Sequence, residues 1–272
     1  MYESLGGTED VFAIHVAFAA TEYGEKLAAN VRYERYNLAH VANETWVALL
    51  GADVNNLLHM PLTYGLTKSF IRATDVAQPG YFDADEKILL QVAAIIHDQG
   101  EAIVGDISFG DKTDADEASE KLAFENNLEA FCPGVSVAMK QCIVAARDTV
   151  VFDATTKLGR MFNAIERSGY VRTALRAAMR LQTNSAGQSD AGLRWILADV
   201  LGVQPAKLIE YAADYPAVDG YLHAQQDKIS TAYTLVHPED FRHYGDQEIA
   251  KQEQFIATQA LWQRYRRNHL MS

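Results

Sequence analysis

The sequence predicts an all-α protein, a bundle of helices followed by a C-terminal helical extension. Apolar residues recur at helical spacing along most of the 272 residues, whereas the alternation typical of strands is scarce and no internal repeat is obvious. A hydrophobic content of 49% excludes wholesale disorder, and a chain of this length can bury a sizeable core.

The first four expected helices follow one another closely. Amphipathic patterns cover residues 11–31 and 36–50, with a polar aromatic segment between them. A third helix over residues 57–74 ends before the Gln78-Pro79-Gly80 turn. The helix over residues 85–99 is apolar on nearly all sides, which favours a central position, and Asp83 or Asp85 is expected to cap it.

The second half of the chain continues the helical pattern. After a loop over residues 107–116, helices are expected over residues 117–131, 135–151, 155–181, 191–201 and 247–269. The polar stretch 182–189 is the best candidate for a linker. The prediction is therefore N-terminal helices over residues 1–54 that pack on a core over 55–181, and a C-terminal extension over 182–272.

The most informative residues lie at the end of the apolar helix. His97 and Asp98 are adjacent, Glu101 follows three residues after the Asp, and Asp106 five residues further on. Polar groups are tolerated in an apolar setting when they are paired, hydrogen-bonded or bound to metal. A neutral imidazole and a carboxylate can bind one divalent cation while a second acid stays free for proton transfer. The alternative is a solvated helix end at Gly100, which the His-Asp pair alone does not exclude.

The wider string of His97, Asp98, Glu101, Gly105 and Asp106 resembles the HD-domain phosphohydrolases, and among them the HD-type 5'-deoxynucleotidases. The resemblance covers roughly residues 55–180. It implies an HD-domain bundle with one divalent metal ion held by a His, the His-Asp pair and a later Asp. It also implies that Glu101 orients or activates the attacking water and that Asp106 acts beside it at the phosphate ester.

The resemblance requires a first His upstream, and His59 is our choice. His59 opens a helix of small and apolar residues, as the family's first His does, whereas His40 lies on an amphipathic pattern without that continuation. His40 is expected to be half-buried and structural.

The last ligand is where the sequence departs from the family. No Asp directly precedes Lys157 or Arg160, and Asp153 is the nearest acid. Asp153 also precedes a helical run, so it is either the last metal ligand or a helix N-cap.

The predicted function is a metal-dependent phosphohydrolase that releases phosphate from a nucleoside or deoxynucleoside monophosphate by attack of a metal-bound water. Lys112 is the expected substrate-binding cation because it follows the motif on the same loop, with Arg32, Arg35 and Lys68 as other basic side chains. The expected cofactor is one divalent metal ion, and the sequence is compatible with Mn, Co, Zn, Fe or Mg. One alternative is a di-iron oxygenase of the same superfamily. The other is a catalytically inactive nucleotide sensor or scaffold, which is supported by the absence of an Asp directly before Lys157 or Arg160.

The composition of the chain indicates which classes of binding partner and which cellular location to expect. The net charge of −12 disfavours binding to a nucleic-acid polymer but not to a small nucleotide. Two cysteines provide no disulfide framework, so buried structural thiols are expected. The acidic start has no targeting pattern, and no apolar run approaches the roughly 20 residues that span a bilayer. A cytoplasmic homo-oligomer, most simply a homodimer, is therefore expected.

Overall fold

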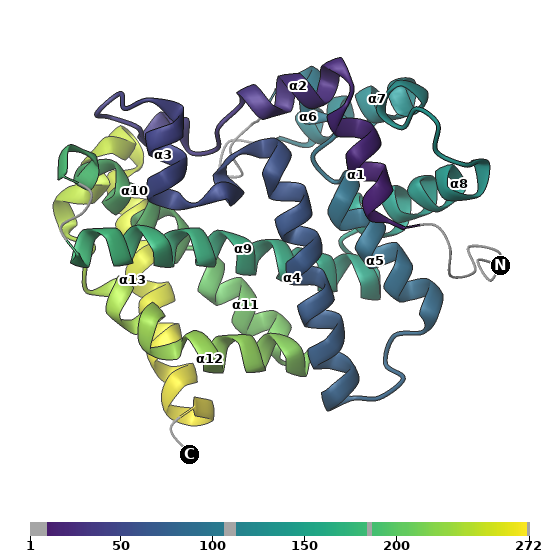
Figure 1. Cartoon of the computed structure of the whole chain (residues 1–272). Coiled ribbons are helices and arrows are strands. Elements are labelled where there is room, and N and C mark those ends of the chain that lie inside the picture. The colour runs from purple at the N-terminus through teal and green to yellow at the C-terminus, as the bar shows by residue number, and fades with distance from the viewer. Residues whose placement is uncertain (1–9, 106–112, 184–186, 271–272) are drawn as a thin grey trace. The chain divides into compact units, whose positions relative to one another are not determined.

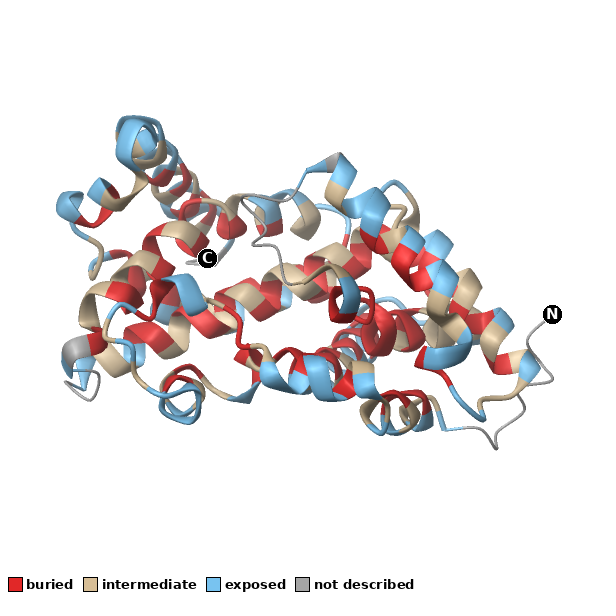
Figure 2. Ribbon diagram, turned by 90° about the horizontal axis from the view of Figure 1, so that it is seen from above, coloured by how far each residue is buried: buried red, intermediate tan, exposed pale blue. Residues whose placement is uncertain are grey.

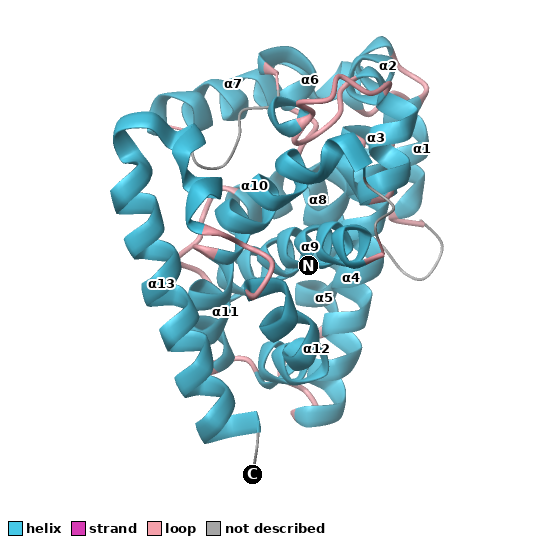
Figure 3. Ribbon diagram, turned by 90° about the vertical axis from the view of Figure 1, so that its left-hand side faces the viewer, coloured by secondary structure: helices cyan, strands magenta, loops and turns pink. Residues whose placement is uncertain are grey.

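The all-α prediction is confirmed by the structure, a computed structural model that describes residues 10–105, 113–183 and 187–270 (Figure 1). In these ranges the regular elements are helices, and strand-like pairing is limited to one isolated bridge between Val31 and Asn55 (Figure 3). The α-helices are α1 (Phe12–Ala19), α2 (Glu22–Ala29), α3 (Asn43–Leu50), α4 (Asn56–Ala77), α5 (Ala84–Ile96), α6 (Glu101–Val104), α7 (Asp114–Phe131), α8 (Val137–Ala146), α9 (Lys157–Gln182), α10 (Asp190–Leu201), α11 (Gln204–Ala212), α12 (Pro216–Tyr233) and α13 (Glu248–Tyr265). Shorter helical turns are η2 (Glu34–Tyr36), η3 (Ala52–Val54), η4 (Arg147–Val151), η5 (Gly187–Ser189), η6 (Pro238–Gln247) and η7 (Arg266–Leu270).

The chain forms two compact units. The first comprises Met1–Arg32 and Ala52–Asn163, and the second comprises Tyr33–Gly51 and Ala164–Ser272. Helix α9 contributes to both, because the boundary falls within it. The sequence-based division into residues 1–54, 55–181 and 182–272 stays a prediction. Residues 184–186 of the expected linker lie outside the described residues.

Local capping explains where the two central helices of the first unit begin. The Asn55 side chain accepts a hydrogen bond from Leu58 N at 3.1 Å, so α4 begins at the next residue. At the start of α5, Asp83 accepts from Glu86 N at 2.8 Å while Glu86 accepts from Asp83 N at 3.0 Å. This reciprocal pair is a capping box, and it selects Asp83 over Asp85 as the cap.

Helix α5 is the buried centre of the first unit, as its apolar pattern predicts. Each residue from 92 to 96 is at most 1% exposed, and α4 packs along α5. Buried residues follow one side of most other helices, with exposed residues opposite them (Figure 2). The His-Asp pair therefore emerges directly from the core of its unit.

Three expected helices differ from the structure. Residues 11–31 form two helices because Thr21 interrupts the first and caps the second, accepting from Gly24 N at 3.2 Å. Residues 36–50 are α-helical only over α3, and His40 is an exposed loop residue with a φ of 47°, not a half-buried helical one. The helix expected over residues 135–151 is α8 followed by the π-helical turn η4.

In the second unit, α9 binds the end of α3. Arg176 donates to Leu50 O at 3.2 Å, and Arg180 donates to Leu49 O at 3.1 Å and Ala48 O at 3.0 Å. These bonds satisfy the last carbonyl groups of α3, which have no hydrogen-bond partner within the helix. They also place positive charge at the C-terminus of α3, where the helix dipole is negative. No helix among the described residues combines the length and the apolar character needed to cross a membrane.

Candidate metal centre

His97 sits at the point where α5 ends, and one hydrogen bond fixes which ring nitrogen carries a hydrogen. The ring is buried, and its Nδ1 lies 3.1 Å from the carbonyl oxygen of Ala94. A carbonyl oxygen only accepts, so Nδ1 must carry the hydrogen and donate it. With the hydrogen on Nδ1, Nε2 is the ring nitrogen left to bind a metal ion.

Helix α4 brings His59 to the same place. The His59 and His97 rings lie with their centroids 5.1 Å apart and their planes inclined at 63°. His59 Nε2 lies 3.8 Å from Oδ2 of Asp98 and 3.4 Å from the hydroxyl of Thr63, one helical turn along α4. His97 Nε2 lies 3.3 Å from Oδ1 of Asp98. The two imidazoles therefore face the two oxygens of a single carboxylate.

His59, His97 and Asp98 form a cluster that could hold a metal ion. All three residues are buried, and their ligand atoms lie within 4.8 Å of one another. Among the residues that the structure describes, this is the cluster of three or more His, Cys, Asp or Glu side chains with that geometry. Two neutral imidazoles and one carboxylate suit borderline divalent ions such as Zn²⁺, Fe²⁺, Mn²⁺ or Co²⁺. The residues present thus fit the expected ion.

Arg32 also contacts the site, although the sequence pattern did not identify it as a site residue. Its guanidinium Nη1 lies 3.3 Å from Oδ2 of Asp98, and the residue is only 9% exposed. The Val31–Asn55 bridge and a 2.6 Å bond from Arg32 N to Val54 O fix this segment beside the start of α4. The contact depends on pairing between distant segments, which residue spacing does not reveal.

Glu101 follows Asp98 by three residues and does not belong to the cluster. It is the first residue of α6, it is buried, and its Oε2 accepts a 3.2 Å hydrogen bond from Nδ2 of Asn56. Asn56 is the first residue of α4 and is fully buried. The site therefore contains a carboxylate separate from the candidate metal ligands, as general base chemistry requires.

Asp153 is not a member of this cluster among the described residues. Its Oδ1 accepts hydrogen bonds from the backbone and hydroxyl of Thr155, at 3.0 Å and 2.6 Å, which hold the pKa of Asp153 below its usual range. Nor is Asp153 the helix cap, because Thr156 Oγ1 accepts from Gly159 N at 2.9 Å just before α9 begins. Local hydrogen bonding thus engages this carboxylate. The predicted Asp106 and Lys112 lie outside the described residues.

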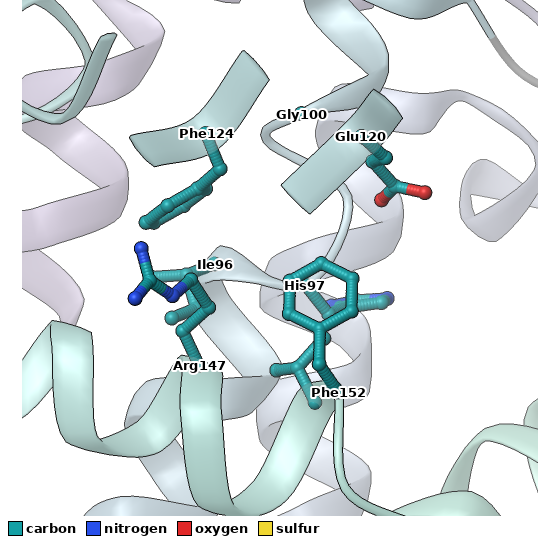
Figure 4. A pocket seen from close by; sticks show the side chains of 8 residues that line it. Ile96, His97, Gly100, Glu120, Phe124, Arg147 and Phe152 are labelled. Carbon is teal, nitrogen blue, oxygen red and sulfur yellow. The ribbon is translucent and has the colours of Figure 1, made fainter. Parts of the chain in front are cut away.

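A small, mainly apolar recess lies against His97 (Figure 4). Phe124 and Arg147 lie together at one side of it, and the Arg147 guanidinium pairs with Asp148 at 2.8 Å and Glu125 at 3.5 Å. The residues around the recess are Ile96, His97, Gly100, Glu120, Phe124, Arg147, Val151 and Phe152. Helix α7 and the turn η4 therefore lie against His97 on this side.

Gly100 allows α7 to approach the turn between Asp98 and Glu101. A Cβ atom at Gly100 would lie 2.6 Å from Cγ of Glu120 and 2.9 Å from its carbonyl oxygen, and real Cβ atoms do not approach so closely. Glu120 is itself buried. The glycine is required by this contact and not by its backbone angles, which are helical at φ −62° and ψ −30°.

No protein-family model matches the sequence, and comparison with curated proteins and with solved structures gives no significant match. The function is therefore argued from the site alone. The site defines a helical protein with a buried His-His-Asp cluster that could hold a metal ion, beside a separate buried carboxylate.

Proposed function

We propose that this protein is a metal-dependent phosphohydrolase of the HD type that releases phosphate from a nucleoside or deoxynucleoside monophosphate. One observation carries the proposal: the buried cluster of His59, His97 and Asp98 lies beside Glu101, which is held separately by Asn56. The order and spacing of these residues along the chain resemble those of the HD-type nucleotidases.

The protein groups have distinct roles in this proposal. His59, His97 and Asp98 would hold a divalent cation, which would polarise a phosphoryl oxygen and lower the pKa of bound water. Arg32 balances the charge of Asp98, so that the double charge of a bound cation remains available to a phosphate dianion. The guanidinium also has donors that suit phosphate oxygens.

Glu101 accepts the proton in the reaction. The oxygen of a water molecule forms a bond to phosphorus while its proton passes to Glu101, and the bond between phosphorus and the ester oxygen breaks. The ester oxygen takes up a proton, so the products are inorganic phosphate and the nucleoside. Positioned acid and base groups of this kind contribute about 10²–10⁴-fold in rate. We assign Asp106 to the ester side and Lys112 to the phosphate, as the sequence predicts.

A second candidate function is an inactive nucleotide sensor or scaffold. The observation that favours it is the position of Asp153 outside the cluster, because the HD pattern uses a later Asp as a metal ligand. A di-iron oxygenase would need additional ligands for a second ion, and the cluster has three members among the described residues. A cytoplasmic location and homo-oligomeric assembly remain predictions.

Phosphate release tests the proposal. The assay uses a panel of nucleoside and deoxynucleoside monophosphates with Mn²⁺, Co²⁺, Zn²⁺, Mg²⁺ or EDTA. Wild type is compared with Glu101→Ala and with Glu44→Ala, which removes an exposed glutamate of α3. We expect metal-dependent release that Glu101→Ala lowers by about 10²–10⁴-fold and Glu44→Ala preserves. Silence across the panel with one bound metal would favour the sensor, and two bound irons would favour the oxygenase.

A further inference from the structure

We propose that Asn56 is a positioning residue that aims Glu101 at the attacking water. This inference rests on the proposed phosphohydrolase function. Its basis is the 3.2 Å hydrogen bond from Asn56 Nδ2 to Glu101 Oε2, between two buried side chains that are 45 residues apart in the sequence.

The backbone around Asn56 is held on both sides. Asn56 N donates to Asn30 O at 3.3 Å, and the preceding Asn55 caps α4 through Leu58 N. His59 follows Asn56 by three residues, which places both side chains on the same face of α4. One helical turn therefore carries a candidate metal ligand and the amide that holds the base. Rigid elements of this kind fix catalytic groups more accurately than loops do.

The chemistry of the pair fixes which atoms interact. An ionised carboxylate only accepts hydrogen bonds, so the amide must present its nitrogen to Glu101. The ionised carboxylate is the form that accepts a proton, and the amide donor is compatible with it.

The second polar atom of the amide points to a role for water. Asn56 Oδ1 is also buried, and it has no hydrogen-bond partner among the described residues. Buried acceptors in proteins are normally satisfied, frequently by an ordered water. A water that donates one hydrogen bond to Asn56 Oδ1 and one to Glu101 would be oriented by both residues. Asn56 would then position the base and the nucleophile together.

A double-mutant cycle on kcat tests this role. Groups that support a catalytic residue typically contribute about 10–100-fold, so Asn56→Ala should lower kcat by that factor while KM and the bound metal stay unchanged. In the Glu101→Gln background, Asn56→Ala should change kcat less than about twofold, because residues acting as a unit are non-additive. The control Asn43→Ala removes an exposed asparagine at the start of α3, and it should preserve kcat. Equal effects of Asn56→Ala in both backgrounds would overturn the proposal.

A second cycle, on stability, separates failure of this inference from failure of the proposed function. Asn56→Asp places two carboxylates together and should lower the urea midpoint of unfolding, and adding Glu101→Gln should restore it by exchanging amide and carboxylate. Additive midpoint changes would show that the pair does not form, which overturns the role of Asn56 whatever the activity. If the double substitution restores the midpoint but the wild-type protein hydrolyses no phosphate ester, the pair forms and the proposed function is wrong. The positioning role then fails together with that function.

Discussion

Substituting Gly100 by alanine should destabilise the protein through one defined contact. The added Cβ would lie 2.6 Å from Cγ of Glu120, whereas carbon atoms in good contact are about 3.5–4.0 Å apart, so a displacement of about 1 Å is needed. The Glu120 side chain could move, but the carbonyl oxygen at 2.9 Å belongs to the backbone of α7, so the helix itself must shift.

The expected magnitude combines two opposing effects. Overpacking of this kind costs about 1–3 kcal/mol. Replacing glycine by alanine at helical backbone angles returns about 0.4–1 kcal/mol by restricting the unfolded chain. The net loss should therefore lie between about 0 and 2.6 kcal/mol, with a central value of about 1.3 kcal/mol. Because Gly100 lies between Asp98 and Glu101, the shift should also weaken metal binding.

Gly65 provides the matched control for this substitution. It lies on the exposed face of α4, and apart from its chain neighbours and the backbone of its own helix no atom lies within 4 Å of the position its Cβ would occupy. Gly65→Ala should therefore stabilise the protein by about 0.4–1 kcal/mol. Urea unfolding of both variants, with metal affinity measured by calorimetry, is the assay. The close contact at Gly100 would be refuted if both substitutions changed stability in the same direction.

Three further predictions follow from the described side chains. Asp153→Ala should leave the amount of metal bound per chain unchanged by elemental analysis, whereas a loss of metal would show that Asp153 is a ligand. Burial raises the pKa of Cys132 to about 12 and that of Cys142 to about 11, so both thiols should resist iodoacetamide at pH 8 until urea is added. Rapid labelling of the native protein would contradict this. Burial lowers the pKa of His243, so the unfolded chain takes up its proton first as the pH falls. The stability that neutral His243 contributes is complete above about pH 6.5 and is lost below it, toward the lower folded-state pKa. His243→Gln should therefore flatten the loss of stability between pH 7 and pH 5, and an unchanged slope would argue against this assignment.

The sequence predicts the parts of the site that depend on local patterns. The apolar run that ends at His97 places this residue at the end of a buried helix, and adjacency then brings Asp98 with it. The choice of His59 over His40 rested on the residues that follow each one, and the structure places His59 in the cluster and His40 in an exposed loop.

The remaining parts depend on contacts that spacing does not encode. Arg32 reaches Asp98 because its segment pairs with the residues before α4, and Glu120 reaches the motif turn because residue 100 is a glycine. Asp153 has suitable chemistry for a ligand and follows the motif in the sequence, but Thr155 two residues later engages its carboxylate. Whether the Asp153 carboxylate bonds to the local turn or reaches the metal cluster depends on three-dimensional geometry. A sequence motif does not contain that information.

The central claim is that the cluster holds one divalent ion, and counting bound metal tests it directly. Wild type, His97→Ala and His40→Ala would be equilibrated with Mn²⁺, Co²⁺ or Zn²⁺, and the ions per chain measured by elemental analysis. We predict one ion in wild type, one in His40→Ala and none in His97→Ala. Equal metal content in wild type and His97→Ala would contradict the account.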